Sequence, residues 1–187
     1  MKYPITIYGD PLLRKTAKSV EKDHEGLEDI IENMWETMYH SDGAGLAAPQ
    51  VGMSLRLFVA DASAAADEDP GLKDFKKVFI NPEIIEIFGD EWIMNEGCLS
   101  LPEIREDIKR PDKVRIRYLD ENFESHEEVF DGYPGRIIQH EYDHLEGVLF
   151  IDHVSPLKKR LLKSKLRNIA LGKVVPHYQI RIPQKKA

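Results

Sequence analysis

The chain has 187 residues, of which 42% are hydrophobic and 32% charged, and its formal net charge is −7. This length and composition are typical of one soluble globular domain. The single cysteine excludes an internal disulfide framework and agrees with a reducing compartment.

The chain carries no apolar run of the roughly 18 residues that a membrane span needs. Residues 1–10 hold a short apolar stretch without a cleavage-site pattern, so no signal peptide is expected. We therefore expect a cytoplasmic protein without a membrane contact. Residues 153–187 contain ten Lys and Arg and no Asp or Glu, whereas the rest of the chain is strongly acidic. This asymmetry indicates a polyanionic partner, with RNA as the first candidate.

Residues 23–40 are predicted to form an amphipathic helix, because their apolar side chains recur at intervals of three and four. Ser41-Asp42-Gly43 would end it. A compact Gly-rich segment follows at residues 43–50, and residues 62–71 resemble a surface loop. The predicted strands are all short: residues 55–60, 78–80, 84–88, 92–94, 114–118 and 124–130.

Two helices are expected in the second half. Pro134 suits the first turn of one, and Gly147 suits the position just past its end. A basic amphipathic helix is predicted over residues 156–171, and a final strand over residues 174–182, where Pro176 favours a sheet edge. The fold class is α+β: one domain, residues 1–187, of short and mostly antiparallel strands around a central helix, with a basic C-terminal helix and tail from about residue 155.

The strongest chemical signal is His140-Glu141-Tyr142-Asp143-His144. Residues four apart lie on the same face of a helix, so both imidazoles can bind one metal ion. Glu141, offset by one residue, can act as general base toward a water on that ion without being a ligand. The alternative is a solvated helix face with two unrelated histidines.

A catalytic zinc site needs a third protein ligand and an open position. Phe150 stands where one group of zinc proteases has a third His, and no Asp or Glu follows Asp152. The third ligand is therefore expected upstream, where Cys98 lies in Glu-Gly-Cys-Leu-Ser. A thiolate is a strong ligand for Zn²⁺ or Fe²⁺. Taken alone, this segment would indicate a strand end around a buried thiol.

Three segments resemble, in order and spacing, the signature motifs of bacterial peptide deformylases: residues 43–50, 96–100 and 139–147. The resemblance extends from Tyr8 to about Asp152. It implies hydrolysis of the N-formyl group from N-formylmethionyl nascent peptides with release of formate. It also implies Fe²⁺ as the ion, with Zn²⁺ or another divalent metal able to substitute.

The resemblance further implies roles for single residues. The metal ligands would be Cys98, His140 and His144. The Gln50 side chain and the Leu99 N–H would join Glu141 in catalysis by stabilising the oxyanion. Substrate would be bound by the Gly45 backbone, by Gly97, which allows close approach, and by Arg105.

Two residues depart from the usual family pattern. Ala44 is smaller than the usual apolar residue at its position, and Arg136 lies where the methionine pocket is often apolar. Either is expected to alter side-chain preference without changing the reaction.

Other functions are less well supported. Residues 43–48 fit the loose dinucleotide pattern G-x-G-x-x-A, which needs a preceding strand and a following helix. Here a helix precedes, and Pro49 and Gly52 disfavour a helix after the loop, so no nucleotide cofactor is expected. A metalloprotease acting on internal peptide bonds is the nearest enzymatic alternative, and the upstream cysteine argues against it.

An RNA- or ribosome-binding role of residues 156–171 would complement the enzyme. The alternative is a solvated helix that docks through its leucines. The remaining histidines, including His126 and His153, show no partner pattern, and Trp35 and Trp92 are expected in the core.

Overall fold

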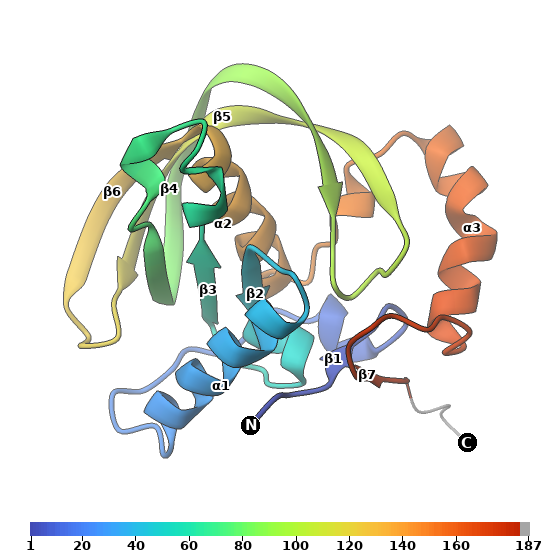
Figure 1. The fold of residues 1–187 in the computed structure, drawn as a ribbon, viewed down its shortest axis with the longest axis horizontal. Coiled ribbons are helices and arrows are strands. Elements are labelled where there is room, and N and C mark those ends of the chain that lie inside the picture. The colour runs from blue at the N-terminus through green and yellow to red at the C-terminus, as the bar shows by residue number, and fades with distance from the viewer. Residues whose placement is uncertain (184–187) are drawn as a thin grey trace.

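A five-stranded antiparallel sheet and a central helix organise the molecule, for which a computed structural model describes residues 1–183. The strand order is β2-β3-β4-β5-β6, and β1 and β7 form a separate parallel pair. The α+β prediction with mostly antiparallel strands around a central helix is confirmed (Figure 1). The elements are α1 (Leu27–His40), α2 (Gly132–Leu145), α3 (Pro156–Ala170), β1 (Ile5–Thr6), β2 (Gly45–Ala47), β3 (Leu57–Asp61), β4 (Lys76–Gly97), β5 (Arg105–Leu119), β6 (Ser125–Asp131) and β7 (Ile180–Arg181).

The prediction of three short strands between residues 78 and 94 is wrong, because β4 is one continuous strand of 22 residues. Its pairing with β5 shifts register near Asn81-Pro82, near Ile85 and near Gly89-Asp90. In the sequence these residues indicate the ends of strands. In the structure they form bulges, which bend a strand without ending it. The bent β4–β5 hairpin arches away from the sheet (Figure 1), and Gly97 at the end of β4 lines the same cleft as Tyr133, His140 and Glu141 of α2.

The helix predictions are largely confirmed, with differences at the ends. Helix α1 begins at Leu27 rather than residue 23, because Gly26 adopts φ 71° and separates the helix from the preceding turns. Helices α2 and α3 lie where they were predicted. The predicted strand over residues 174–182 is wrong for most of its length, since only Ile180–Arg181 pairs with β1.

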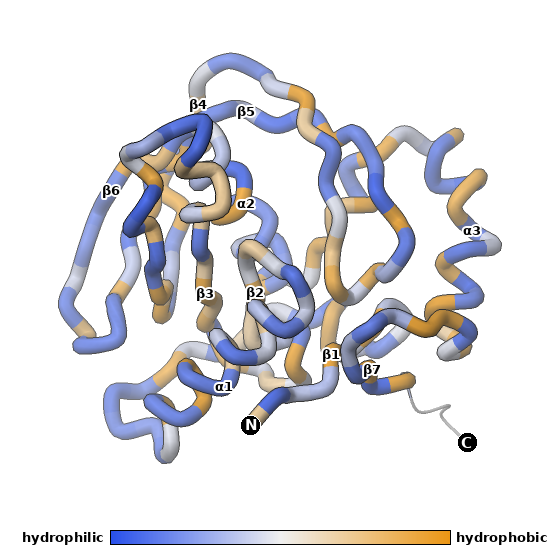
Figure 2. Tube along the Cα trace, in the orientation of Figure 1, coloured by the Kyte–Doolittle hydropathy of each residue, from blue (hydrophilic) through white to orange (hydrophobic). Residues whose placement is uncertain are grey.

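Helix α2 lies in the centre, and Ile137, Ile138 and Leu145 along its length pack on the sheet. There, Phe58 and Phe79 stack with ring centroids 4.5 Å apart. Apolar segments line the inside of the fold, as Figure 2 shows along the sheet and α1. Trp35 packs against the core as expected, but Trp92 is 37% exposed on the β4–β5 arm, so the core prediction for it is wrong.

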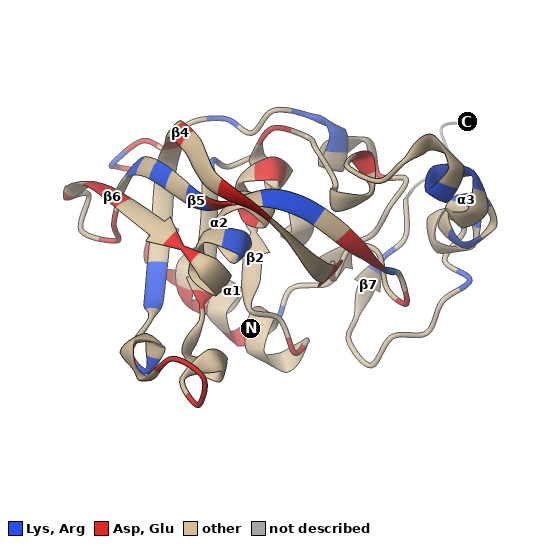
Figure 3. Ribbon diagram, turned by 90° about the horizontal axis from the view of Figure 1, so that it is seen from above, with Lys and Arg blue, Asp and Glu red and all other residues tan. Residues whose placement is uncertain are grey.

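Helix α3 stands apart from the sheet and carries most of the basic residues of its region (Figures 1 and 3). It docks through Leu162, Leu166 and Ile169, whereas Leu157 and Leu161 are exposed. Burying an apolar side chain of this size contributes roughly 1.5–3 kcal/mol, so three residues suffice to hold the helix. None of the helices within residues 1–183 has both the length and the apolar character to cross a membrane.

Candidate active site

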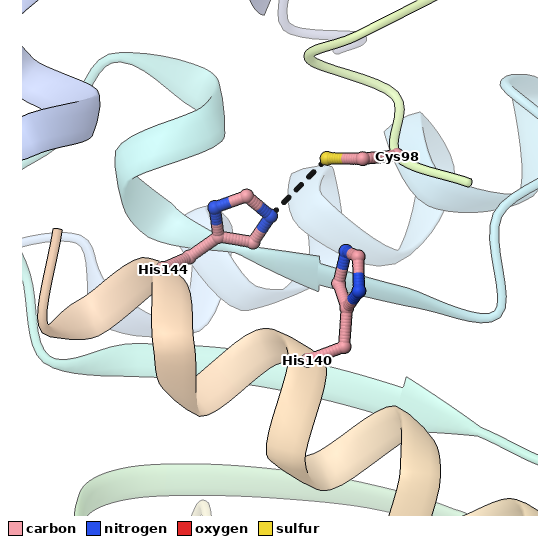
Figure 4. Close-up of side chains that lie close together, drawn as sticks. All are labelled: Cys98, His140 and His144. Carbon is pink, nitrogen blue, oxygen red and sulfur yellow. Dashed lines mark hydrogen bonds between the residues drawn. The ribbon is translucent and has the colours of Figure 1, made fainter. Parts of the chain in front are cut away.

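Two histidines of α2 and the cysteine after β4 converge on one point. Figure 4 shows His140 and His144, one turn apart, both directed toward Cys98. The Cys98 Sγ lies 3.2 Å from His144 Nε2, and one ligand atom from each of the three residues lies within 4.8 Å of the others. One thiolate and two imidazoles form a donor set that fits Zn²⁺ or Fe²⁺ and leaves a position open.

Local sequence explains why α2 ends where it does. Gly147 has φ 72°, and a Cβ there would lie 2.6 Å from the carbonyl carbon of Arg14. Only glycine combines this left-handed backbone with so close an approach. The prediction that the helix ends just before Gly147 is therefore confirmed, and His144 lies in the last turn of the helix.

A buried carboxylate orients His140. The Nδ1 of His140 lies 2.9 Å from Glu96 Oε2, so this nitrogen donates to Glu96 and the other ring nitrogen faces Cys98. Arg110 and Arg136 each donate to Glu96 Oε1, over 2.8 and 2.9 Å. Burial would raise the pKa of Glu96, but the hydrogen bonds from His140 and Arg110 outweigh it and hold that pKa well below its usual range.

The charge network continues to the surface. Arg110 also donates to Asp143 Oδ2 over 2.8 Å, and His153 Nε2 lies 2.8 Å from the same oxygen. The sequence shows no partner pattern for His153 or His126, but the fold pairs His153 with Asp143 and His126 with Asp120. Asp143 belongs to the histidine motif itself, whereas Glu96 and Arg110 come from β4 and β5, so no spacing in the sequence linked those two to the motif.

The surroundings of Cys98 favour its thiolate. Burial raises the pKa of the Cys98 thiol, but the charge of His144 and hydrogen bonds with His140 and His144 outweigh burial and lower the pKa to about 5. The thiolate is the form that binds metal ions. The imidazoles that stabilise the thiolate in this way must be neutral to bind a metal ion, so metal binding at this site would release protons.

Glu141 lies beside the ligand cluster with a free oxygen. Its Oε2 is buried without a hydrogen-bond partner among residues 1–183. Burial raises the pKa of Glu141 to about 7, although the charges of His140 and His144 oppose the shift. A carboxylate with a pKa near neutrality suits proton transfer at physiological pH.

The absence of a side chain at Gly45 leaves room for the Glu141 carboxylate. A Cβ at Gly45 would lie 2.6 Å from Glu141 Oε1 and 2.8 Å from its carboxyl carbon. Real Cβ atoms do not approach so closely, so the Gly-rich segment is required here for packing as well as for any backbone contact with a ligand.

Gln50 faces the ligand cluster from the 3-10 turn Ala48–Val51. The Ala47 N–H donates to Gln50 Oε1 over 2.8 Å, which directs the amide nitrogen toward the cleft. That nitrogen lies 3.4 Å from both Cys98 Sγ and Ser100 Oγ. A Gln50 amide that is held at one end presents a fixed N–H donor at the other.

These residues line a cleft of about 380 Å³. Every predicted site residue lines it except His144, which is 1% exposed and lies deeper. Arg105 sits at the rim, where its guanidinium donates to the Asn95 side chain and carbonyl over 2.8 and 2.9 Å. A Cβ at Gly97 would lie 2.7 Å from Arg105 Nη1, so the absence of a side chain at Gly97 leaves room for the Arg105 guanidinium.

Arg136 lines the cleft without offering it a free charge. It is 3% exposed and donates to Glu96, to the Ile108 carbonyl and to the Trp92 carbonyl. Its guanidinium also lies over the Trp92 ring, 4.9 Å from the centroid. The cleft wall near Arg136 is therefore partly aromatic, because of the Trp92 ring, and the charge of Arg136 is compensated by Glu96.

Comparison with known proteins agrees with this geometry. A family model described as polypeptide deformylase matches residues 2–160. A peptide deformylase of Christiangramia forsetii is 52% identical, over 100% of this chain and 98% of the relative. The crystal structure of peptide deformylase from Thermotoga maritima superposes with a TM-score of 0.75 and 47% identity, covering 83% of this chain and 99% of that chain. Peptide deformylase 1B from Arabidopsis thaliana gives 0.81 and 33%, covering 95% and 98%.

These matches confirm the resemblance carried by the three sequence motifs. The family model spans the Gly-rich loop, the segment around Cys98 and the histidine motif on α2. Identity to the Christiangramia relative is about half over the whole of this chain. The chain therefore belongs to the polypeptide deformylase family.

Proposed function

We propose that the cleft removes the N-formyl group from the N-terminal methionine of newly made polypeptides by metal-dependent hydrolysis, releasing formate. The observation that carries this proposal is the convergence of Cys98, His140 and His144 in an open cleft with Glu141 beside them. We propose Fe²⁺ as the resident ion, with Zn²⁺ able to substitute, because thiolate and imidazole ligands suit both.

A divalent ion bound by Cys98, His140 and His144 would polarise the substrate carbonyl and lower the pKa of a water in the cleft. Glu141 is proposed to take a proton from that water and to pass it to the leaving amine. Its unpartnered buried oxygen and its raised pKa support this role.

Two donors are proposed to stabilise the charge that develops on the formyl oxygen. The Gln50 amide is fixed by its bond from Ala47 and points at the ligand cluster. The Leu99 N–H follows Cys98 directly and is used in none of the hydrogen bonds among residues 1–183. Losing one preorganised donor of this kind typically costs about 10²–10³ in rate.

The position of β2 supports backbone binding of an extended peptide. Strand β2 lies at the edge of the five-stranded sheet, so one side of it pairs with β3 and the other is open. An extended peptide can add to such an edge through main-chain hydrogen bonds. We propose that Gly45 pairs with substrate in this way, with Gly97 and Arg105 closing the opposite rim.

An apolar first side chain, such as methionine, fits the proposed pocket. Ala44 and Ile137 line it, and the charge of Arg136 is already compensated by Glu96. Arg136 is therefore proposed to shape the pocket without recruiting an acidic side chain.

The decisive experiment measures formate release from a formyl-methionyl peptide before and after chelation of the metal. We expect release that stops on chelation and returns when Fe²⁺ or Zn²⁺ is added. The same peptide without its formyl group should remain intact. Cleavage of internal peptide bonds would instead favour the protease alternative.

A contact between α3 and the ribosome is proposed as well, which would place the enzyme in the cytoplasm beside emerging nascent chains. Its support is the exposure of five basic side chains around two exposed leucines, Leu157 and Leu161. Leucines that served only for docking would be buried, and these are not. The basic residues are Lys159, Arg160, Lys163, Lys165 and Arg167.

Charge reversal tests this contact. Replacing Lys163 and Arg167 by Glu should abolish co-sedimentation with ribosomes at low salt, since phosphate contacts dominate such binding and weaken as salt rises. Lys73→Glu, an exposed reversal on a distant loop, serves as control. Binding that is equal for all three proteins, or insensitive to salt, would contradict a role of α3.

A further inference from the structure

The chain beyond α3 returns to the body and reaches the cleft. After α3, Gly172 adopts φ 67° and turns the chain back. The Ile5 N–H then donates to the Gln179 carbonyl over 2.8 Å, and β7 pairs in parallel with β1, as Figure 1 shows. We call residues 173–183 the return segment. It lies outside the residues that the family model matches.

The return segment is packed firmly against the body. A Cβ at Gly52 would lie 1.9 Å from Arg181 Nη1, so the Arg181 guanidinium fills space that only glycine leaves open. Tyr178 packs on the core around α1, and Ile180 packs on the core that holds α3. Contacts with three separate parts of the molecule fix the course of the segment past the cleft.

Within this segment, Tyr178 lines the cleft and donates through its hydroxyl to the Leu99 carbonyl over 2.8 Å. The adjacent carbonyls are also held: Cys98 O accepts from the Leu101 N–H over 2.9 Å, and Ser100 O accepts from the Tyr8 N–H over 2.8 Å. Three consecutive carbonyls after β4 are thus each fixed by a different partner. Leu99 is the one whose partner is a side chain.

We propose that Tyr178 is a positioning residue for deformylation, which fixes the Leu99 carbonyl and so aims the N–H of the same residue at the substrate oxygen. This inference rests on the proposed function, because Leu99 is proposed there as an oxyanion donor. The Leu99 N–H lies in the same peptide plane as the Cys98 carbonyl, which the Leu101 N–H holds. The Leu99 carbonyl lies in the next plane, so the bond from Tyr178 fixes the second of the two planes that meet at the Leu99 Cα. Burial keeps the pKa of Tyr178 above its usual value, so the hydroxyl stays a donor.

Steady-state kinetics can distinguish a positioning role of Tyr178 from a role as part of the cleft wall. A donor that is aimed at the transition state affects kcat with little effect on KM, whereas a wall that merely contacts bound substrate changes KM. Misplacing a catalytic group by about 1 Å can cost about 100-fold, and loosening one of two donors should cost less.

The test compares Tyr178→Phe with Tyr118→Phe. Tyr118 is buried, whereas Tyr178 is partly buried, and the Tyr118 hydroxyl likewise donates a hydrogen bond, to the Glu128 side chain, but Tyr118 does not line the cleft. For Tyr178→Phe we expect kcat to fall about 10-fold with KM and metal content nearly unchanged. Amide hydrogen exchange of residues 99–101 should become faster in this variant alone, as read by NMR.

Each other outcome would overturn the positioning role. Unchanged kcat in Tyr178→Phe would do so, as would a rise in KM at constant kcat or an equal loss in Tyr118→Phe. Exchange at residues 99–101 equal to that of the wild type would do so as well. If the wild-type enzyme released no formate, the proposed function itself would be refuted. If the wild type were active and the variants gave any of the contradicting results above, only the role of Tyr178 would be refuted.

Discussion

Helices α2 and α3 have nearly equal lengths, 14 and 15 residues, yet only α2 buries polar side chains beside its apolar ones. Helix α3 buries three apolar residues and leaves its charges to solvent. Helix α2 lies inside the molecule and buries five polar residues: Arg136, Gln139, His140, Glu141 and His144.

Burying a charged group costs several kcal/mol unless partners compensate for it. Around α2 most of that cost is offset, because Glu96 binds Arg110, Arg136 and His140. Three buried side-chain atoms on α2 lack partners within residues 1–183: Arg136 Nε, Glu141 Oε2 and His144 Nδ1. The comparison teaches that buried polar atoms without hydrogen-bond partners indicate where a reaction takes place. The exposed charges of α3 indicate at most a contact surface. The following predictions, in order of expected effect on deformylation, test this contrast.

Cys98→Ala should have the largest effect, because it removes the thiolate that completes the ligand set with His140 and His144. We expect the purified variant to contain no bound metal and to release formate no faster than chelated wild-type protein. Elemental analysis and a formate assay provide the measurement. A full metal complement in this variant would refute the ligand assignment.

Glu141→Gln should keep the metal and lose turnover by about 10²–10⁴, the usual contribution of a general acid–base group. Because Glu141 is buried with an unpaired oxygen, its neutral amide should leave the melting temperature unchanged or raise it. Calorimetry beside kinetics separates the two effects. Loss of activity through unfolding would show as a lower melting temperature, and it would count against a catalytic role.

Gly45→Ala should reduce kcat by about 10²-fold, because the new Cβ would lie 2.6 Å from Glu141 Oε1 and must displace that carboxylate. Gly71→Ala, in an exposed loop, is the matched control. Steady-state kinetics of both variants decide the matter. Wild-type kcat in Gly45→Ala would mean that Glu141 can move without consequence.

Substitutions on α3 should have the smallest effect on deformylation. Two neighbouring leucines on this helix, one buried and one exposed, allow a test. Leu162 is 7% exposed and Leu161 is 73% exposed. Leu162→Ala should lower the free energy of unfolding by about 2–5 kcal/mol, and Leu161→Ala by less than about 0.5 kcal/mol. Denaturant titration measures both. Equal losses would show that α3 does not dock as described, and a strong fall in kcat for Leu161→Ala would break the contrast with α2.

Local patterns predicted part of the fold well. Amphipathic spacing located α1 and α3, and Pro134 with Gly147 bracketed α2 within about two residues. The β4 strand was missed as a unit, because Asn81-Pro82 and Gly89 are turn signals in a sequence. Their bulged pairing with β5 becomes visible only once the partner strand is known.

For the site, the sequence by itself determined what helix geometry dictates. Residues four apart on a helix share a face, so His140 and His144 meet one ion, and Glu141 must lie just beside it. The choice of Cys98 followed from the chemistry of thiolate ligands and was strengthened by the family motifs.

Only the tertiary structure decided which groups support these residues. The carboxylate on His140, the arginines that hold it, and the contact of Tyr178 with Leu99 join segments that lie far apart in the chain. Such contacts depend on strand register and on the path of the return segment, and a single bulge changes both. Helix periodicity is a local property of the chain, whereas the partners of a buried charge are set by long-range packing.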